Sequence, residues 1–373
     1  MMKVKKVFWQ VSLLIFIIIV TYSSSSFACS AFVSTRGNQI LIGNNEDYYT
    51  KFSDIVVRIR PSDNKNYGRL MIGYNQMAVS MGGINDQGLF YDSFIVPAGD
   101  WRRDPEKEAY NNFMLDDILG SCATVEEVIA FCRRYNLPYF KNNQLFVVDK
   151  SGKAAVISWG ETDVEVTRMK KDYQAVTNFL LQHPERGNTP CRRYASINKT
   201  LSNNKKHTFE LACKIMDSVH AEASWGKTQY TNIVNLLNGD FRVFYGSNFE
   251  EYIIFNISEE LKNSYKNYQI PDYVSDIRSL ETTRPGLQDP KRVSIKWTGK
   301  PDSKYTVYCS TDPEFKDCQP MPVPDKSRVM ACFTFALENI EPNTTYYYKI
   351  NGKRHGAKSS VSITKSFKTS GTD

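Results

Sequence analysis

Cys29 is the residue whose position could by itself support chemistry. It follows the small-x-small sequence Ser26-Phe27-Ala28, so cleavage of an export signal after Ala28 would make Cys29 the first residue of the mature protein. Its thiol would then lie beside a free α-amine, a group that titrates near neutral pH and can take the thiol proton. An N-terminal cysteine therefore carries a nucleophile and its base in one residue.

Two other interpretations of Cys29 stay open at this point. Cys29 could be the lipidated residue of a lipoprotein, or a small residue at a cleavage site with no catalytic role. The usual bacterial lipidation signal has Leu or another apolar residue three positions before the cysteine, where this chain has Ser26. A motif this short matches too many sequences to decide between the interpretations.

Residues 1–28 are predicted to be a secretory signal. They combine a charged start, an apolar core at 11–20 and the cleavage site, and the core is shorter than the roughly 20 residues that span a membrane. We therefore expect an exported protein, periplasmic or extracellular, that is held at a membrane only if Cys29 is lipidated.

The composition narrows the class of partner. The 373-residue chain has a net charge of +7; the signal contains three lysines and no acids, so the remaining 345 residues carry about +4. A net charge this small does not indicate a nucleic-acid partner.

The histidines and cysteines predict no metal site, because the four histidines are scattered and there is no Cys-x-x-Cys pair; we also expect no cofactor. Cys309 and Cys318 could form a disulfide or stay reduced.

The hydrophobic pattern predicts an α+β fold. Short strand patterns fill 29–94 and 145–177, including strands at 39–43 and 76–81, and the polar residues 44–47 are expected to form a turn. Helical periodicity occupies 112–135 and 192–220, and Thr124 with Glu127 forms a capping box. Strands return at 230–256. This order favours antiparallel sheets with helices on their outer faces.

A second, all-β domain is predicted near the C-terminus. We place the large domain at 29–275, a Pro- and Gly-containing linker at 276–290 and a small β-sandwich at 291–373, with Trp297 as its buried aromatic residue. The run from Leu337 through Pro342 to Tyr346 resembles the corner of a fibronectin type III domain. The sandwich could be a binding module, a spacer or a purely structural addition.

Short motifs follow Cys29 in a fixed order, and together they resemble one family. They are Gly43-Asn44-Asn45-Glu46-Asp47, Asn85-Asp86-Gln87-Gly88-Leu89, Val147 to Gly152, Val176-Thr177-Asn178, Arg193-Tyr194 and Thr228-Gln229-Tyr230-Thr231. The chain up to about residue 260 is similar to the choloylglycine hydrolase and penicillin V acylase family, a branch of the N-terminal-nucleophile (Ntn) hydrolases. The resemblance implies an αββα sandwich whose Cys29 attacks an amide carbonyl.

The same resemblance assigns roles to three further residues. Asp47 matches the carboxylate that hydrogen-bonds the α-amine, and Asn178 matches the amide that donates to the oxyanion. Arg193 matches the arginine that closes the pocket behind the nucleophile, with its neighbour Arg192 as the alternative. Cys191 could line the site or simply be buried.

Two departures from the family pattern bear on the substrate. The bile-salt and penicillin enzymes have Arg where this chain has Asn44, and their second Asn has no clear equivalent, Asp92 or Ser93 being nearest. We take Asn44 and Asp92 as candidate substrate-binding residues. The Asn-Glu-Asp sequence is closer to the acyltransferase-like branch, similar to isopenicillin-N acyltransferase. There is no Gly-Cys pair for self-cleavage, so signal peptidase would have to expose Cys29.

We therefore expect an exported amidohydrolase that acts on a small-molecule acyl amide: an N-acyl amino acid, an acylated amine, or a bile-salt or penicillin-V-like compound. The alternatives are an acyltransferase of the same fold and a lipid-anchored surface binding protein without catalysis. The chain could also form a homo-oligomer. A papain-like protease is disfavoured, because Cys29 opens a strand and no histidine has the matching setting.

Overall fold

The computed structural model describes residues 29–48, 54–77, 80–184, 191–223, 226–283, 291–316, 318–325, 328–354, 356 and 358–370. The predicted signal at 1–28 and residues 284–290 of the predicted linker lie outside these ranges. Within them, no helix has both the length and the apolar character needed to cross a membrane.

Two antiparallel sheets form the centre of the molecule. In the first, the strands run in the order β12 (Tyr173–Thr177), β1 (Ser30–Ser34), β2 (Leu41–Tyr48), β14 (Gly226–Asn235), β15 (Asp240–Tyr245) and β16 (Glu251–Asn256). In the second, the order is β11 (Val164–Arg168), β10 (Ala154–Trp159), β9 (Asn143–Asp149), β6 (Leu89–Ile95), β5 (Gly82–Asn85), β4 (Arg69–Tyr74), β3 (Ile55–Arg60) and β17 (Lys266–Gln269).

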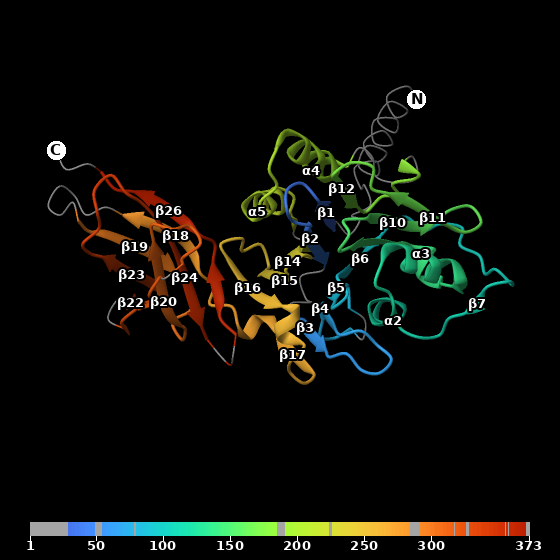
Figure 1. The fold of residues 1–373 in the computed structure, drawn as a ribbon, viewed down its shortest axis with the longest axis horizontal. Helices are drawn as coiled ribbons and strands as arrows, with labels where there is room; N and C mark the ends of the chain where they lie inside the picture. The colour runs from blue at the N-terminus through green and yellow to red at the C-terminus, as the bar shows by residue number, and fades with distance from the viewer. Residues whose placement is uncertain are drawn as a thin grey trace, which may run out of the picture.

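Helices cover the outer face of each sheet (Figure 1). Helices α4 (Arg192–Asn203) and α5 (Phe209–Ser218) pack on β12, β1, β2 and β14, while α2 (Met114–Ser121) and α3 (Val125–Arg134) pack on the second sheet. One apolar cluster fills the space between the sheets, and two more lie between each sheet and its helices. The layers are therefore α-β-β-α, and the predicted fold class is confirmed.

Short elements complete the large domain: β7 (Glu108–Ala109), β8 (Tyr135–Asn136), β13 (Glu222–Ala223), α6 (Ile257–Glu260) and the 3-10 turns η1 (Pro138–Lys141) and η3 (Ile270–Asp272). Helix α3 begins with the predicted capping box, in which the Thr124 side chain accepts from the Glu127 backbone and the Glu127 carboxylate accepts from the Thr124 backbone.

Two local predictions are wrong. Residues 44–47 are not a turn but the interior of β2, because β1 and β14 pair with both edges of β2 and take up its backbone hydrogen bonds. The strand predicted at 76–81 does not form at 76–77 or 80–81, while 78–79 lie outside the described residues. The chain turns there instead, with the Met77 N–H donating to Tyr74 O at 3.1 Å, and the strands are β4 and β5.

The C-terminal segment forms a small β-sandwich. One layer holds β18 (Arg278–Thr283), β19 (Val293–Thr298), β23 (Cys332–Leu337) and β22 (Arg328–Val329), and the other holds β24 (Thr345–Lys353), β20 (Lys304–Ser310), β21 (Met321–Pro322), β25 (Ser360–Ser362) and β26 (Lys365–Lys368). Trp297 is buried between the layers and stacks on Phe333 with ring centroids 5.4 Å apart. Residues 278–283, predicted as linker, are a strand instead, because Leu280 is buried in this core.

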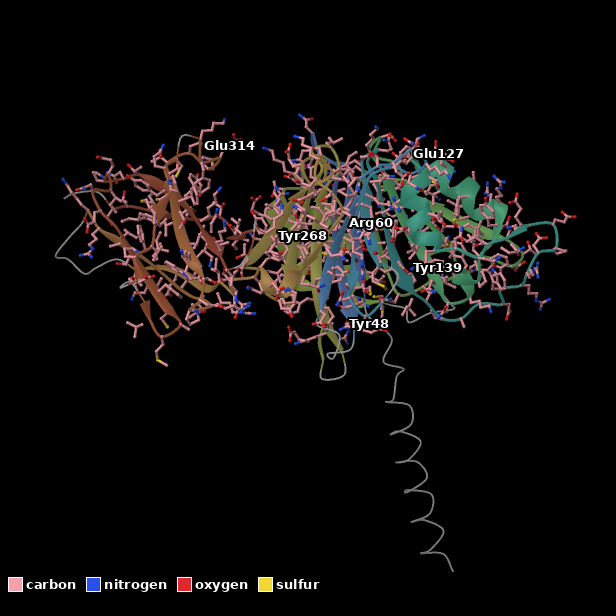
Figure 2. The ribbon with its side chains drawn as sticks, turned by 90° about the horizontal axis from the view of Figure 1, so that it is seen from below. Tyr48, Arg60, Glu127, Tyr139, Tyr268 and Glu314 are labelled. Carbon is pink, nitrogen blue, oxygen red and sulfur yellow. The ribbon has the colours of Figure 1, made fainter. Side chains whose placement is uncertain are left out.

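The sandwich continues the first sheet of the large domain. Strand β25 pairs with β16, so the second layer of the sandwich extends the sheet that carries β1 and β2. The buried carboxylate of Glu251 strengthens this junction by accepting from the backbone N–H groups of Ser275 at 2.7 Å and Ile277 at 2.9 Å. Figure 2 shows the result as an elongated molecule, with Glu314 of the sandwich and Glu127 of α3 towards opposite ends.

Gly83→Ala is expected to destabilise the second sheet, because a Cβ at this position would lie 2.5 Å from Leu70 O, a backbone atom inside the sheet. Overpacking of this kind costs about 1–3 kcal/mol, so the urea midpoint of unfolding should fall. Gly99→Ala is the control, since its nearest neighbour, Trp159 Cδ1, would be 3.9 Å away. Equal midpoints for the two variants would contradict the packing described.

Candidate active site

Cys29 lies at the start of β1 with its side chain in the core between the two sheets. Along β1 the side chains alternate: Cys29, Ala31 and Val33 belong to the inter-sheet cluster, while Phe32 packs under the helices. The thiol is 4% exposed, and its Sγ donates weakly to Asp47 O at 3.8 Å. The candidate nucleophile therefore points into the space between the two sheets, while the next residue, Ser30, faces α4 on the outer side of the first sheet.

Arg193 holds that backbone from the first turn of α4. Its Nη1 donates to Cys29 O and to Ser30 Oγ, both at 2.7 Å, and lies 4.0 Å from Asp47 Oδ2. Arg192 is exposed. The geometry thus separates the two arginines that the sequence leaves as alternatives. Cys191, the residue before the helix, is half-buried and accepts from the Thr177 hydroxyl at 3.4 Å.

Asp47 is buried on β2, with its carboxylate on the side of the sheet that faces Arg193. Its Oδ1 accepts from the Thr228 hydroxyl, and its Oδ2 has no hydrogen-bond donor among the described residues. Burial raises the pKa of Asp47 to about 7, against the opposing effects of Thr228, Arg193 and His220. A buried carboxylate oxygen beside the backbone of Cys29 is suited to receive a positively charged α-amine.

Glu46, which the sequence analysis did not single out, lies beside the thiol. It is 1% exposed, and its pKa is raised by burial and then by the nearby carboxylates of Asp92 and Asp47. A sequence signal for it did exist, because Glu46 has the same strand parity as Ile42, whose side chain lies in the inter-sheet core. The neighbouring Cys29 thiol acts in the opposite direction and lowers the Glu46 pKa.

The same acids control the thiol. Burial raises the pKa of Cys29, and the charges of Glu46, Asp47 and Asp92 raise it further. With residue 28 joined to Cys29, no α-ammonium offsets these charges. The thiolate, which is the nucleophilic form, is therefore disfavoured in this chain.

Two further predicted site residues, Asn178 and Asn44, are held by hydrogen bonds to other parts of the core. Asn178 follows β12, and its Nδ2 donates to Ile95 O of the other sheet at 2.8 Å. Gln144, which sequence reasoning missed, anchors this segment by donating to Thr177 O at 2.6 Å and Phe179 O at 3.0 Å. Asn44 is fully buried, and its Nδ2 donates to Asn232 Oδ1 at 3.3 Å.

Of the two residues considered for the missing Asn, only Asp92 shares the inter-sheet space with Cys29. Ser93 points to the other face of β6, where its hydroxyl contacts Tyr139 Oη at 2.7 Å. Across the described ranges, no group of three or more His, Cys, Asp or Glu side chains is arranged to hold a metal ion.

A known family matches most of the large domain. Residues 34–247 match the model of a family described as acyl-coenzyme A:6-aminopenicillanic acid acyl-transferase. The matched range begins five residues after Cys29. No relative is found among the curated proteins.

Several solved structures share the fold. A mutant of the conjugated bile acid hydrolase from Clostridium perfringens superposes with a TM-score of 0.50 at 16% identity, covering 65% of this chain and 96% of that one. Penicillin V acylase from Agrobacterium tumefaciens gives a TM-score of 0.52 at 14% identity, covering 65% and 92%. At these identities the likeness supports the fold alone.

Asp47→Asn should change how stability depends on pH in the full chain with residues 1–28 attached. An unfolded Asp ionises near pH 3.9, but folded Asp47 does so at about pH 7, so the folded state holds an extra proton between these values. Wild-type stability therefore falls as pH rises through this window, by at most about 4 kcal/mol.

The asparagine in the variant cannot ionise, so the variant does not lose stability in this pH window. The free energy of unfolding of the variant minus that of the wild type should therefore increase between pH 4 and pH 8. Urea unfolding at several pH values measures the difference, and Asp54→Asn in an exposed position is the control. A difference between Asp47→Asn and wild type that does not change with pH would contradict the raised pKa of the buried Asp47 carboxylate.

Proposed function

Because the chain belongs to the acyl-coenzyme A:6-aminopenicillanic acid acyl-transferase family, we propose that it cleaves linear amide C–N bonds through a thioester on Cys29. The observation that carries this proposal is the setting of Cys29: its thiol faces the inter-sheet space, and its backbone carbonyl is bound by Arg193. The fold of the bile acid hydrolase and the penicillin V acylase supports the same class of reaction.

The reaction begins when cleavage after Ala28 frees the α-amine of Cys29. This amine takes the thiol proton, Sγ attacks the amide carbonyl, and the tetrahedral adduct collapses as the protonated amine gives its proton to the leaving nitrogen. A thioester and a free amine result. Water then attacks the thioester, its proton passes through the α-amine to Sγ, and a carboxylic acid is released.

Three side chains support these steps. Asp47 holds the α-ammonium through Oδ2, which accepts no hydrogen bond among the described residues, and the ammonium would also lower the Asp47 pKa below the value of about 7 that it has with residue 28 attached. Arg193 fixes the carbonyl of Cys29. Asn178 uses one amide hydrogen for Ile95 O and keeps a second for the oxyanion, a contact worth on the order of 10²–10³ in rate.

The free α-amine of Cys29 depends on export and cleavage of the signal. We propose that residues 1–28 direct the protein out of the cytoplasm and that signal peptidase exposes the α-amine. The raised pKa of the Cys29 thiol supports this order of events, because the site stays inactive until a positive charge is created beside it. The processed protein is then soluble, periplasmic or extracellular.

A transferase is the second candidate, and the description of the matching family favours it. The chemistry differs only in the acceptor, since an amine in place of water attacks the thioester. The acyl products formed in the presence of added amines separate the two. A lipid-anchored binding protein is the third candidate, and acylation of the Cys29 sulfur and nitrogen would remove both nucleophile and base.

We also propose that the C-terminal sandwich is fibronectin type III-like and serves as a binding or spacer module. Tyr346 supports this assignment, because its hydroxyl accepts from the backbone N–H of Glu341 at 2.9 Å, the bond that defines a tyrosine corner.

Replacing the nucleophile provides the direct test of function. Cys29→Ala should abolish hydrolysis of any N-acyl amide that the wild type cleaves, in a panel of N-acyl amino acids, acylated amines, penicillin V and glycine-conjugated bile acids. Cys332→Ala, at an exposed cysteine of the sandwich, should leave the rates unchanged. Amine release followed by mass spectrometry measures both, and activity retained in Cys29→Ala would overturn the mechanism.

The two neighbouring arginines allow a matched comparison. Arg193→Ala removes both bonds that fix Cys29 and Ser30, and a small displacement of the nucleophile costs about 10²-fold in kcat/KM. Arg192→Ala should change kcat/KM less than about twofold, because the side chain is exposed. A larger effect at Arg192 than at Arg193 would show that the positioning role is misassigned.

A further inference from the structure

A polar cluster lies in the inter-sheet core next to the Cys29 thiol. It consists of Glu46 on β2, Tyr230 on β14 and Asp92 on β6 of the facing sheet. Glu46 and Tyr230 are directly opposite each other in the β2–β14 register, and both have the strand parity of residues in the inter-sheet core. All three side chains are at most 1% exposed.

Each of the three residues has a buried polar atom without a partner. Glu46 Oε2, Asp92 Oδ2 and Tyr230 Oη make no hydrogen bond, and neither acid forms an ion pair, within the described parts of the chain. The other oxygen of Asp92, Oδ1, accepts from the Ser93 N–H at 2.7 Å. Unpaired buried polar atoms are costly, so three in one place beside a nucleophile indicate a ligand that pairs with them.

The backbone opposite Asp92 leaves room for its carboxylate. Gly82 pairs with Asp92 across β5 and β6, and a Cβ at Gly82 would lie 2.7 Å from Asp92 Oδ2. Any other residue would displace the carboxylate, so the absence of a side chain at Gly82 preserves its position. The charges of Glu46 and Asp92 also raise the pKa of Tyr230, after the larger effect of burial, as expected for groups that share one small space.

The chemistry of the cluster matches a protonated primary amine. An ammonium group has three N–H donors and no acceptor, and the cluster offers three acceptors, two of them on acids that no cation balances among the described residues. The three acceptors come from three separate strands in two sheets, which fixes their relative positions.

The position of Sγ decides which half of the substrate carries the amine. The acyl carbon becomes bonded to Sγ, and Sγ points into the inter-sheet space that holds the cluster. The leaving nitrogen must instead approach the α-amine, on the backbone side, where Asp47 and Arg193 lie. Substituents of the acyl group therefore enter the cluster, while those of the leaving amine do not.

We propose that Glu46, Asp92 and Tyr230 bind a protonated amino group on the acyl half of the substrate, so that the enzyme selects aminoacyl amides over neutral acyl amides. This inference rests on the amide-cleaving function proposed above. It adds a substrate class: compounds with a free amino group close to the scissile carbonyl, such as amino acid amides and small peptides with a free N-terminus.

The test uses the full chain, exported and processed, and two substrates of the same shape. L-alanyl 4-nitroanilide and isobutyryl 4-nitroanilide differ only in an ammonium group in place of a methyl group and release the same absorbing amine. The wild type should prefer the alanyl compound by at least about tenfold in kcat/KM. Glu46→Gln and Asp92→Asn should each reduce this ratio about 10- to 100-fold, the usual worth of a bond to a charged group.

Two further variants keep the result interpretable. Tyr230→Phe removes only the hydroxyl and should lower the ratio several-fold, even if an acid variant does not fold. Glu161→Gln, at an exposed position, is the matched control and should leave the ratio unchanged.

The outcomes distinguish this inference from the function on which it rests. Cleavage of the isobutyryl compound at least as fast as the alanyl one by the wild type, or an unchanged ratio in all three cluster variants, overturns the inference and leaves amide cleavage intact. If the wild type cleaves neither compound and no amide in the wider panel, both this inference and the proposed amide-cleaving function are overturned.

Discussion

A carboxylate buried away from water is stable only where a cation or hydrogen-bond donors replace its hydration, and this constraint governs the whole region around Cys29. Three buried acids, Glu46, Asp47 and Asp92, lie near one thiol. Together they disfavour the thiolate while residue 28 is joined to Cys29. We propose that removal of residue 28 creates an α-ammonium that compensates Asp47, and that a substrate ammonium compensates Glu46 and Asp92. Under this proposal, processing, substrate choice and nucleophile activation all depend on one arrangement of charges.

The fold provides the positions that this electrostatic arrangement requires. Strand β1 has partners on both sides, so the alternation of its side chains is fixed: Cys29 faces the second sheet, while Ser30 faces α4 and Arg193. Asp92 reaches the same space only because the second sheet packs face to face with the first. The C-terminal sandwich continues the first sheet through β16 and β25, at the opposite edge from β12 and Asn178.

Much of this arrangement could be predicted from sequence, and the failures have physical causes. Motifs single out Cys29, Asp47 and Arg193, and the structure brings them together; their roles remain predictions. The turn predicted at 44–47 is wrong because local propensity favours a turn for polar residues, whereas pairing with β1 and β14 decides the outcome. Glu46 was missed for the same reason. Tyr230 and Gln144 could not be assigned, since only tertiary contacts bring them near Cys29 and Asn178.

The proposed mechanism requires Cys29 to act with a free α-amine, and intact mass spectrometry of the exported protein detects that amine most directly. We expect the mass of an unmodified chain that begins at Cys29 and, after brief exposure to a cleavable amide, a second species heavier by one acyl group that maps to Cys29. A chain that begins elsewhere would contradict this mechanism, and one that carries lipid on Cys29 would also favour the anchored binding protein.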